Sequence, residues 1–191
     1  MHLTESVVDI NKALIEQCRH GSREAYYKLY KLYAKAMFNI CLRMLNKRSD
    51  AEDMLQEVFT DVFQKLKSFQ YKSTFGAWLK QIVVNKCINE LKRKKAELEY
   101  LDDIEEVFDI PEENNDGLSE YELAMSVQNV KKAMEQLPDG SRTIFSLYLL
   151  EGYGHVEIAE ILNITESTSK SQYMRARQKV KEILTTMSNE R

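Results

Sequence analysis

Hydroxyl and basic side chains gather near the end of the chain, in the segment "ITESTSKSQYMRARQKV". Lys and Arg can donate hydrogen bonds to guanine, Met can contact the methyl group of thymine, and hydroxyls can bind phosphate oxygens. Helical spacing separates an inner set from an outer set. The inner set is Ser169, Tyr173, Ala176, Val180 and Leu184; the outer set is Thr168, Lys170, Ser171, Met174, Arg175 and Arg177. We therefore expect a helix over residues 166–187 that reads DNA.

The residues before this helix supply a turn and a partner helix, expected over residues 155–162. Ala159 is a small residue where two helices would cross, and Asn163 stands where the backbone needs a positive φ, which Asn tolerates. Thr165 can cap the second helix. Together these features predict a helix-turn-helix. The alternative, an amphipathic helix with a solvated basic face, fits the charges but leaves the turn residues without a role.

The elements that position this motif are expected to be helices, because the 191 residues include only six Gly and two Pro. Helix interiors avoid both residues, whereas strand-rich proteins use them in turns, so the predicted fold class is all-α. Ser49, followed three residues later by Glu52, has the pattern of a capping box. Expected helices cover 6–20, from the cap Ser22 into the forties, from the cap Ser49 to about 66, about 74–95, 121–136 and 139–151.

An acidic segment separates two basic parts of the chain. Twelve Asp and Glu residues, and no Lys or Arg, lie between Glu97 and Glu122; without their twelve negative charges the net charge of −3 becomes +9. Too few apolar residues accompany them to form a core. We expect two small helical domains, residues 1–96 and 121–191, joined by an acidic linker over 97–120.

Several classes of protein find no support in the sequence. No apolar run approaches the roughly 18 residues of a membrane span, and the first residues lack the pattern of a signal peptide. The three cysteines fall within helical patterns, as expected of reduced thiols in the cytoplasm. No Gly-rich phosphate loop or Cys–His constellation is present, and the three His are scattered. We therefore expect no enzyme, no metal or other cofactor, no small-molecule substrate and no insertion into a membrane.

Three segments in this order resemble bacterial RNA polymerase sigma factors of the extracytoplasmic-function class. They are "SDAEDMLQEVFTDVFQKLKSF", "STFGAWLKQIVVNKCINELKR" and "LPDGSRTIFSLYLLEGYGHVEIAEILNITESTSKSQYMRAR". The resemblance covers about residues 22–96 and 121–187, which would be sigma domains 2 and 4. It implies a subunit that brings core RNA polymerase to promoter DNA and helps to melt it, and that is commonly held inactive by an anti-sigma factor.

The resemblance assigns roles to residues in the first domain. The segment "DAEDMLQEVF" matches the part that docks on the clamp helices of the largest polymerase subunit, and Asp53, Gln56 and Glu57 would share one helix edge there. A solvated acidic face is the alternative, and a catalytic or metal-binding carboxylate pair has less support because no His lies nearby.

The loop "FQYKST" and the helix after it match the part that melts and reads the −10 element, where unpaired bases need stacking and edge contacts. The implied −10 residues are Phe69, Tyr71, Lys72, Ser73, Thr74, Lys80, Asn85, Lys86, Lys92 and Arg93. Asn85 would lie near the captured base, and the four later cations would contact phosphates. Taken individually, Phe69, Phe75 and Trp78 have the pattern of core residues.

In the second domain, the resemblance assigns the −35 element to Lys170, Ser171, Met174 and Arg175, with Thr168 and Arg177 beside them. The chain departs from the family at Ser169, where an apolar residue is common, and at Gln172, which is often basic. A buried Ser169 hydroxyl could bond back to the carbonyl four residues earlier. Two further readings remain, a free-standing helix-turn-helix regulator and a structural helical adaptor; the first needs no strand-melting loop, and the second leaves the charge segregation without a role.

Overall fold

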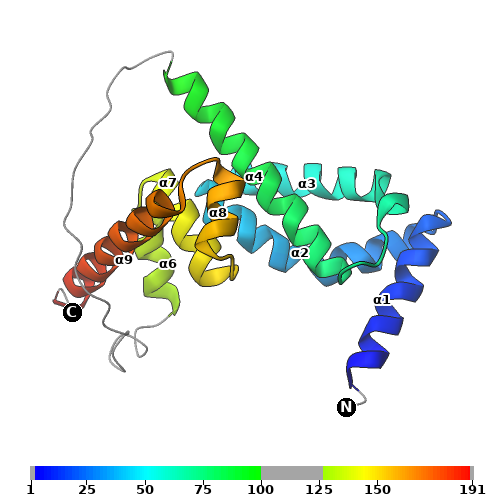
Figure 1. Cartoon of the computed structure of the whole chain (residues 1–191). Coiled ribbons are helices and arrows are strands. Elements are labelled where there is room, and N and C mark those ends of the chain that lie inside the picture. Colours follow the sequence, from blue (N-terminus) through cyan, green and yellow to red (C-terminus); the bar gives the residue numbers. More distant parts are fainter. Residues whose placement is uncertain (1–2, 100–126, 190–191) are drawn as a thin grey trace. The chain divides into compact units, whose positions relative to one another are not determined.

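The computed structural model describes residues 3–99 and 127–189, which form helices and no strand (Figure 1). The chain divides into two compact units, residues 1–90 and 91–191, and the boundary falls within helix α4 (Phe75–Glu99). The all-α prediction is therefore confirmed. Residues 97–99 of the expected linker belong to α4, and residues 100–120 lie outside the described ranges.

The first unit contains α1 (Leu3–Arg19), α2 (Arg23–Leu45), α3 (Arg48–Gln64), a 3-10 turn η1 (Leu66–Ser68) and most of α4. Aromatic pairs join α2 to α3. The rings of Tyr26 and Phe63 are 4.7 Å apart, and those of Tyr30 and Phe59 are 4.8 Å apart. Both pairs meet edge to face, the arrangement that the ring quadrupoles favour. Aliphatic side chains of this unit are also buried, and Leu29, Val58, Val62, Leu79 and Val83 are inaccessible to solvent.

The starts of α2 and α3 differ. Ser22 caps α2 as predicted, and its hydroxyl accepts a hydrogen bond from the Ala25 N–H at 3.3 Å. The predicted capping box at Ser49 is wrong, because the N-cap of α3 is Lys47, two residues before Ser49, and it makes no side-chain hydrogen bond. That start places Ser49 inside the first turn, where its hydroxyl donates to Asp50 at 3.2 Å. Glu52 pairs instead with Arg48, four residues before it, at 2.8 Å.

The second unit contains α6 (Val127–Glu135), α7 (Asp139–Phe145), a π-helical turn (Ser146–Leu150), α8 (His155–Leu162) and α9 (Glu166–Asn189). The helix expected over 139–151 is thus an α-helix that ends in a π turn. A buried cluster of Ala133, Met134, Leu137, Phe145, Ala176, Val180 and Leu184 holds α6, α7 and α9 together. The inner face expected for α9 is confirmed by this cluster.

Candidate nucleic-acid interface

Helix α9 separates a buried face from a polar one, as its sequence pattern predicts. Ser169, Ala176 and Val180 are buried. Lys170, Ser171, Met174 and Arg175 are exposed, whereas Thr168 and Arg177 are half-buried. Lys170 pairs with Glu166 at 2.7 Å, and this hydrogen bond lowers the pKa of the Glu166 carboxyl. The polar face therefore offers cationic, hydroxyl and thioether groups to one partner surface.

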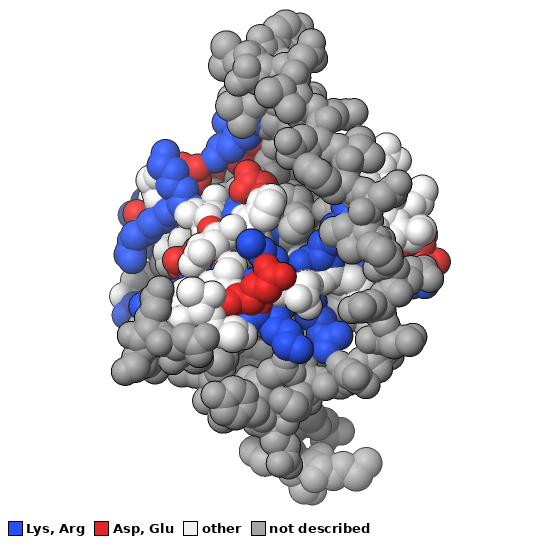
Figure 2. All heavy atoms as spheres, turned by 90° about the vertical axis from the view of Figure 1, so that its left-hand side faces the viewer, with Lys and Arg blue, Asp and Glu red and all other residues white. Residues whose placement is uncertain are grey.

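Figure 2 shows the molecule from the side on which α9 lies in Figure 1. Lys and Arg atoms form several groups there, with acidic and neutral atoms between them.

Local chemistry forms the turn between α8 and α9. Asn163 ends α8 with a φ of 57°, the left-handed conformation predicted for it, and the Ile164 N–H donates to the Ala159 carbonyl at 3.0 Å. Thr165 caps α9 as expected, accepting a hydrogen bond from the Thr168 N–H at 3.0 Å. Ala159 is buried, as expected of the small residue where the helices cross. These contacts set the angle at which α9 leaves the turn.

A second link between α8 and α9 was not predicted from the sequence. The His155 Nδ1 lies 2.9 Å from the Ser169 hydroxyl, which is fully buried. The His155 ring stacks on Tyr148, with ring centres 4.3 Å apart, and meets the edge of Tyr173. Ser169, the departure from the family pattern, thus bonds a ring on the partner helix. Burial lowers the pKa of His155, and the nearby Lys170 lowers it further.

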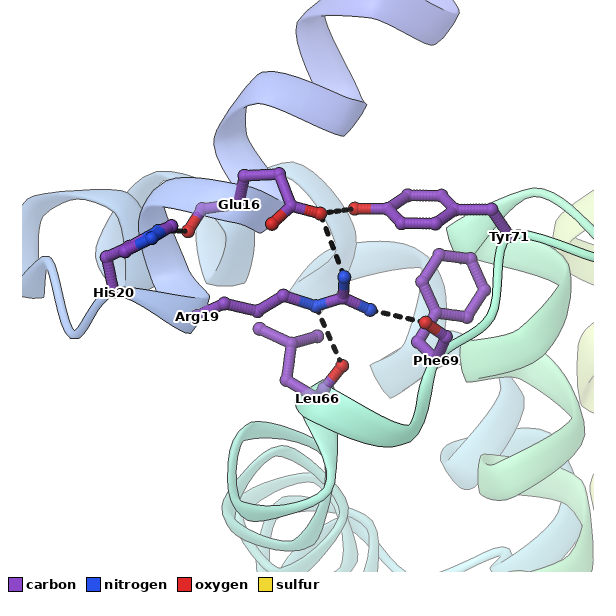
Figure 3. A network of polar contacts seen from close by, with 6 residues as sticks. All are labelled: Glu16, Arg19, His20, Leu66, Phe69 and Tyr71. Carbon is purple, nitrogen blue, oxygen red and sulfur yellow. Dashed lines mark hydrogen bonds and ion pairs between the residues drawn. The ribbon is translucent and has the colours of Figure 1, made fainter.

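The loop of residues 69–74, called the 69–74 loop below, is joined to the end of α1. Tyr71 donates a hydrogen bond from its hydroxyl to Glu16 at 2.6 Å (Figure 3). Arg19 donates to the carbonyl oxygens of Leu66 and Phe69. Lys72, Ser73 and Thr74 are exposed. No local sequence pattern links Glu16 or Arg19 to this loop, so both were missed.

Phe69 does not offer a base-stacking surface in this structure. Its side chain is 4% exposed and packs against the rings of Tyr71, Phe75 and Trp78. The interpretation of Phe69 and Phe75 as core residues is confirmed, whereas Trp78 is half-buried. Among the aromatic rings of the loop, Tyr71 is the one that reaches the surface, with 37% exposure.

The predicted DNA-facing residues of α4 have different surroundings. Asn85, Lys92 and Arg93 are exposed, and Lys80 is half-buried. Lys86 makes ion pairs with Glu57 and with Asp61 of α3, the latter at 2.9 Å. Burial alone would lower the pKa of Lys86, but the hydrogen bonds to the two carboxylates outweigh burial and raise it. A hollow between α3 and α4 is lined by Asp61, Val62, Lys65, Ile82, Asn85, Lys86 and Asn89.

A polar strip runs along α3. Asp53, Gln56, Glu57 and Thr60 are exposed, while Met54, Leu55, Val58 and Phe59 between them are buried. We call these four exposed residues the α3 strip. Because Glu57 also pairs with Lys86, the strip meets the predicted DNA-facing side of α4 at that residue.

Within the ranges that the structure describes, no three or more His, Cys, Asp and Glu side chains are grouped to hold a metal ion. None of the described helices is long and apolar enough to cross a bilayer.

Comparison with known proteins agrees with this geometry. Residues 29–97 match the family sigma-70 region 2, and residues 125–180 match sigma-70, region 4. The sigma-E factor of Escherichia coli is 30% identical over 188 residues, covering 93% of this chain and 95% of the relative. SigW of Bacillus subtilis is 28% identical over 180 residues, covering 91% of this chain and 96% of SigW.

Solved structures share the fold. The sigma factor RpoE of Bartonella quintana, in complex with the anti-sigma factor NepR, has a TM-score of 0.54 at 24% identity and covers 84% of this chain and 96% of that chain. CnrH, in complex with the cytosolic domain of CnrY, has a TM-score of 0.52 at 22% identity and covers 92% and 97%. The chain belongs to the extracytoplasmic-function class of the sigma-70 family of RNA polymerase sigma factors. It therefore acts in transcription initiation, the function that the sequence predicted.

Proposed function

We propose that the two units divide the work of initiation. The α3 strip docks on core RNA polymerase, the 69–74 loop and α4 capture the opened −10 element, and the polar face of α9 reads the −35 element. The observation that carries this proposal is the separation of faces on α9, where Ser169 is buried beside exposed Lys170 and Ser171. That arrangement leaves the start of the helix available to base edges in the major groove.

The first experiment measures binding to bacterial core RNA polymerase and run-off transcription from a promoter library. The double variant Asp53→Ala, Gln56→Ala should weaken association with core polymerase by about tenfold, which is about 1.4 kcal/mol. Glu24→Ala is the matched control, because Glu24 is an exposed carboxylate on α2 that pairs with Lys28 outside the strip. If the double variant binds core polymerase as tightly as this control, the docking role of the α3 strip is wrong.

The −35 assignment is tested with Lys170→Ala and Arg175→Ala on the promoter that the library selects. Loss of a base contact costs about 1–3 kcal/mol and relaxes preference at one base pair, whereas loss of a phosphate contact lowers the salt slope by about one. Lys179→Ala is the control, since Lys179 is an exposed cation on the same helix that pairs with Glu182 at 3.5 Å. Equal behaviour of all three variants would contradict the assignment.

We further propose that the chain works in the cytoplasm, catalyses no reaction by itself and is held inactive by an anti-sigma factor. Support comes from RpoE and CnrH, whose structures contain the anti-sigma factor NepR and the cytosolic domain of CnrY. Both units also expose large apolar side chains of the kind that protein partners cover: Tyr27, Leu32, Tyr148, Leu149, Leu150 and Val156. Competition between an isolated anti-sigma factor and core polymerase for the purified chain tests this proposal, and simultaneous binding of both would contradict it.

A further inference from the structure

Arg19, at the end of α1, reaches the segment that joins α3 to α4. Its Nε donates to the Leu66 carbonyl at 3.3 Å, its Nη2 donates to the Phe69 carbonyl, and its Nη1 pairs with Glu16 at 2.8 Å (Figure 3). These two carbonyls stand at the start of η1 and just after its end. One planar guanidinium thus joins two backbone oxygens that lie 47 and 50 residues further along the chain.

Glu16 completes the connection through the ring of Tyr71. The Tyr71 hydroxyl donates to the same Glu16 oxygen that Arg19 contacts, and the Arg19 guanidinium lies 5.0 Å from the centre of the Tyr71 ring. Burial and the hydrogen bond to Glu16 raise the pKa of Tyr71 to about 12, so the phenol remains a donor at neutral pH. The hydrogen bond from Tyr71 is also the largest cause that lowers the pKa of Glu16.

The backbone of Tyr71 shows that these contacts hold the loop in an unusual conformation. Its φ is 56°, in the left-handed region that bulky residues rarely occupy. Such a conformation persists where the surroundings favour it, and the described contacts of Tyr71 are with Glu16, Arg19 and Lys12 of α1 and with the Phe69 ring. The end of α1 therefore fixes the position of Tyr71, the residue that directly precedes the exposed residues 72–74.

We propose that Arg19 and Glu16 are positioning residues for promoter opening, which hold the 69–74 loop ready to capture an unpaired base. The proposal rests on the proposed function of that loop in reading the −10 element. A loop that is ordered before DNA arrives loses less conformational freedom on binding, so capture is tighter. Arg19 does not act by touching DNA itself, because its side chain is 19% exposed and all three guanidinium nitrogens donate within the protein.

The test uses the full chain bound to core polymerase and the promoter selected by run-off transcription. The measurements are permanganate reactivity of unpaired thymines and affinity for the non-template single strand of the −10 region. Arg19→Ala should reduce both by about tenfold, and Arg19→Lys should recover part of the loss because Lys keeps the charge but cannot bridge both carbonyls. Arg23→Ala, an exposed cation at the start of α2, is the matched control and should change neither.

Two further measurements separate positioning from other roles. Affinity for core polymerase should stay unchanged in Arg19→Ala, because the α3 strip keeps its contacts; a parallel loss of this affinity would mean a general structural role and would overturn the proposal. The slope of single-strand affinity against salt should also stay unchanged. A slope smaller by about 0.7 would identify Arg19 as a direct phosphate contact and would overturn the proposal as well.

A final pair of variants distinguishes this inference from the proposed function. Tyr71→Ala and Lys72→Ala test the loop directly. If they impair opening while Arg19→Ala leaves it intact, the positioning role is wrong and the loop keeps its function. If all three variants open the promoter normally, the −10 role of the loop is wrong, and the positioning role with it.

Discussion

The 69–74 loop and the turn between α8 and α9 each contain one residue in the left-handed backbone conformation, followed by polar side chains. The φ is 56° at Tyr71 and 57° at Asn163. The turn is held by residues within five positions, through Ala159, Thr165 and Thr168. The loop is held by Glu16 and Arg19, 47 to 55 residues before the groups that they contact. The same backbone conformation thus has two different causes. At position 163 it follows from the tolerance of Asn for a positive φ, whereas at Tyr71 it depends on contacts with residues far away in the sequence.

This difference indicates which substitutions would disturb the loop and which would disturb the turn. Asn adopts the left-handed region readily because its short polar side chain can bond locally, so the turn needs little support from elsewhere. Tyr has no such tolerance, so the loop depends on α1. Changes at the turn should therefore act through the backbone of the changed residue itself, whereas changes at the loop should act through contacts with α1.

The largest effect is expected from placing a β-branched residue in the turn. Asn163→Val should destabilise the second unit by about 1–3 kcal/mol, because a β-branched side chain is strained at positive φ. Asn163→Gly is the matched control and should change stability much less, since Gly adopts this φ freely. Urea unfolding, monitored by circular dichroism, measures the stability of both variants. Equal stabilities of the two variants would show that the positive φ at position 163 does not determine the stability of the turn.

The second effect concerns the bond that joins the two helices of the motif. Ser169→Ala removes the hydroxyl that lies 2.9 Å from His155 and should cost about 1–2 kcal/mol, because a partly buried ring nitrogen loses its partner. Ser171→Ala is the control on the same helix, where the hydroxyl is exposed and donates to the Thr168 carbonyl at 3.1 Å. It should change stability by less than about 0.5 kcal/mol. A double-mutant cycle with His155→Phe gives the coupling, and zero coupling would contradict the link.

The third effect is a dependence on pH. Because the pKa of His155 is lowered in the folded chain from its ordinary value of 6.5, the unfolded chain binds the proton more readily. The contribution of neutral His155 to the free energy of unfolding is therefore fully present above pH 6.5 and is lost as pH falls through the lowered pKa of the folded chain. Stability of the second unit should fall more steeply in wild type than in His155→Phe below that pH. The charged groups that act on His155 are Lys170 and Glu166, and identical profiles in the two proteins would exclude His155 as the cause.

Local patterns account for the parts of the structure that the sequence predicted. The inner face of α9, the left-handed Asn163 and the caps Ser22 and Thr165 all depend on residues within a few positions. The predicted capping box at Ser49 is absent because α3 begins before Ser49, and Glu52 pairs with Arg48 instead, which is also a local contact. The pattern marks Ser49 as the N-cap, but the N-cap of α3 is Lys47, two residues earlier.

The contacts that sequence reasoning missed connect distant positions. Arg19 meets carbonyl oxygens, which every residue carries, so no residue type marks its partners. His155 and Ser169 lie 14 positions apart, and the unusual serine was noticed while its partner was not. The pairing of Lys86 with Glu57 joins two residues to which the family resemblance gave separate roles. Packing of one helix on another decides such contacts, and periodicity within one helix does not report them.

The smallest effect is expected from two serines near the starts of helices in the first unit, Ser22 at α2 and Ser49 at α3. Ser22→Ala should cost about 0.5–1 kcal/mol, because its hydroxyl caps α2 through a 3.3 Å hydrogen bond. Ser49→Ala should be close to neutral, since Ser49 is exposed and caps nothing. Thermal unfolding of both variants and of the wild type measures the difference. A larger loss of stability in Ser49→Ala would support a capping role for Ser49.

Ser22 lies only three residues from Arg19, yet alanine substitutions at the two positions should differ in their effects. Ser22→Ala should lower stability, whereas Arg19→Ala should impair promoter opening. Loss of the Ser22 cap removes free energy from the start of α2 but leaves the contacts of Arg19 with Leu66 and Phe69 in place. Promoter opening by Ser22→Ala should therefore match wild type at temperatures where both are folded. Arg19→Ala should open promoters poorly even when it is fully folded. A Ser22→Ala variant that also fails to open promoters would mean that the loop responds to the stability of the unit rather than to the position of Arg19.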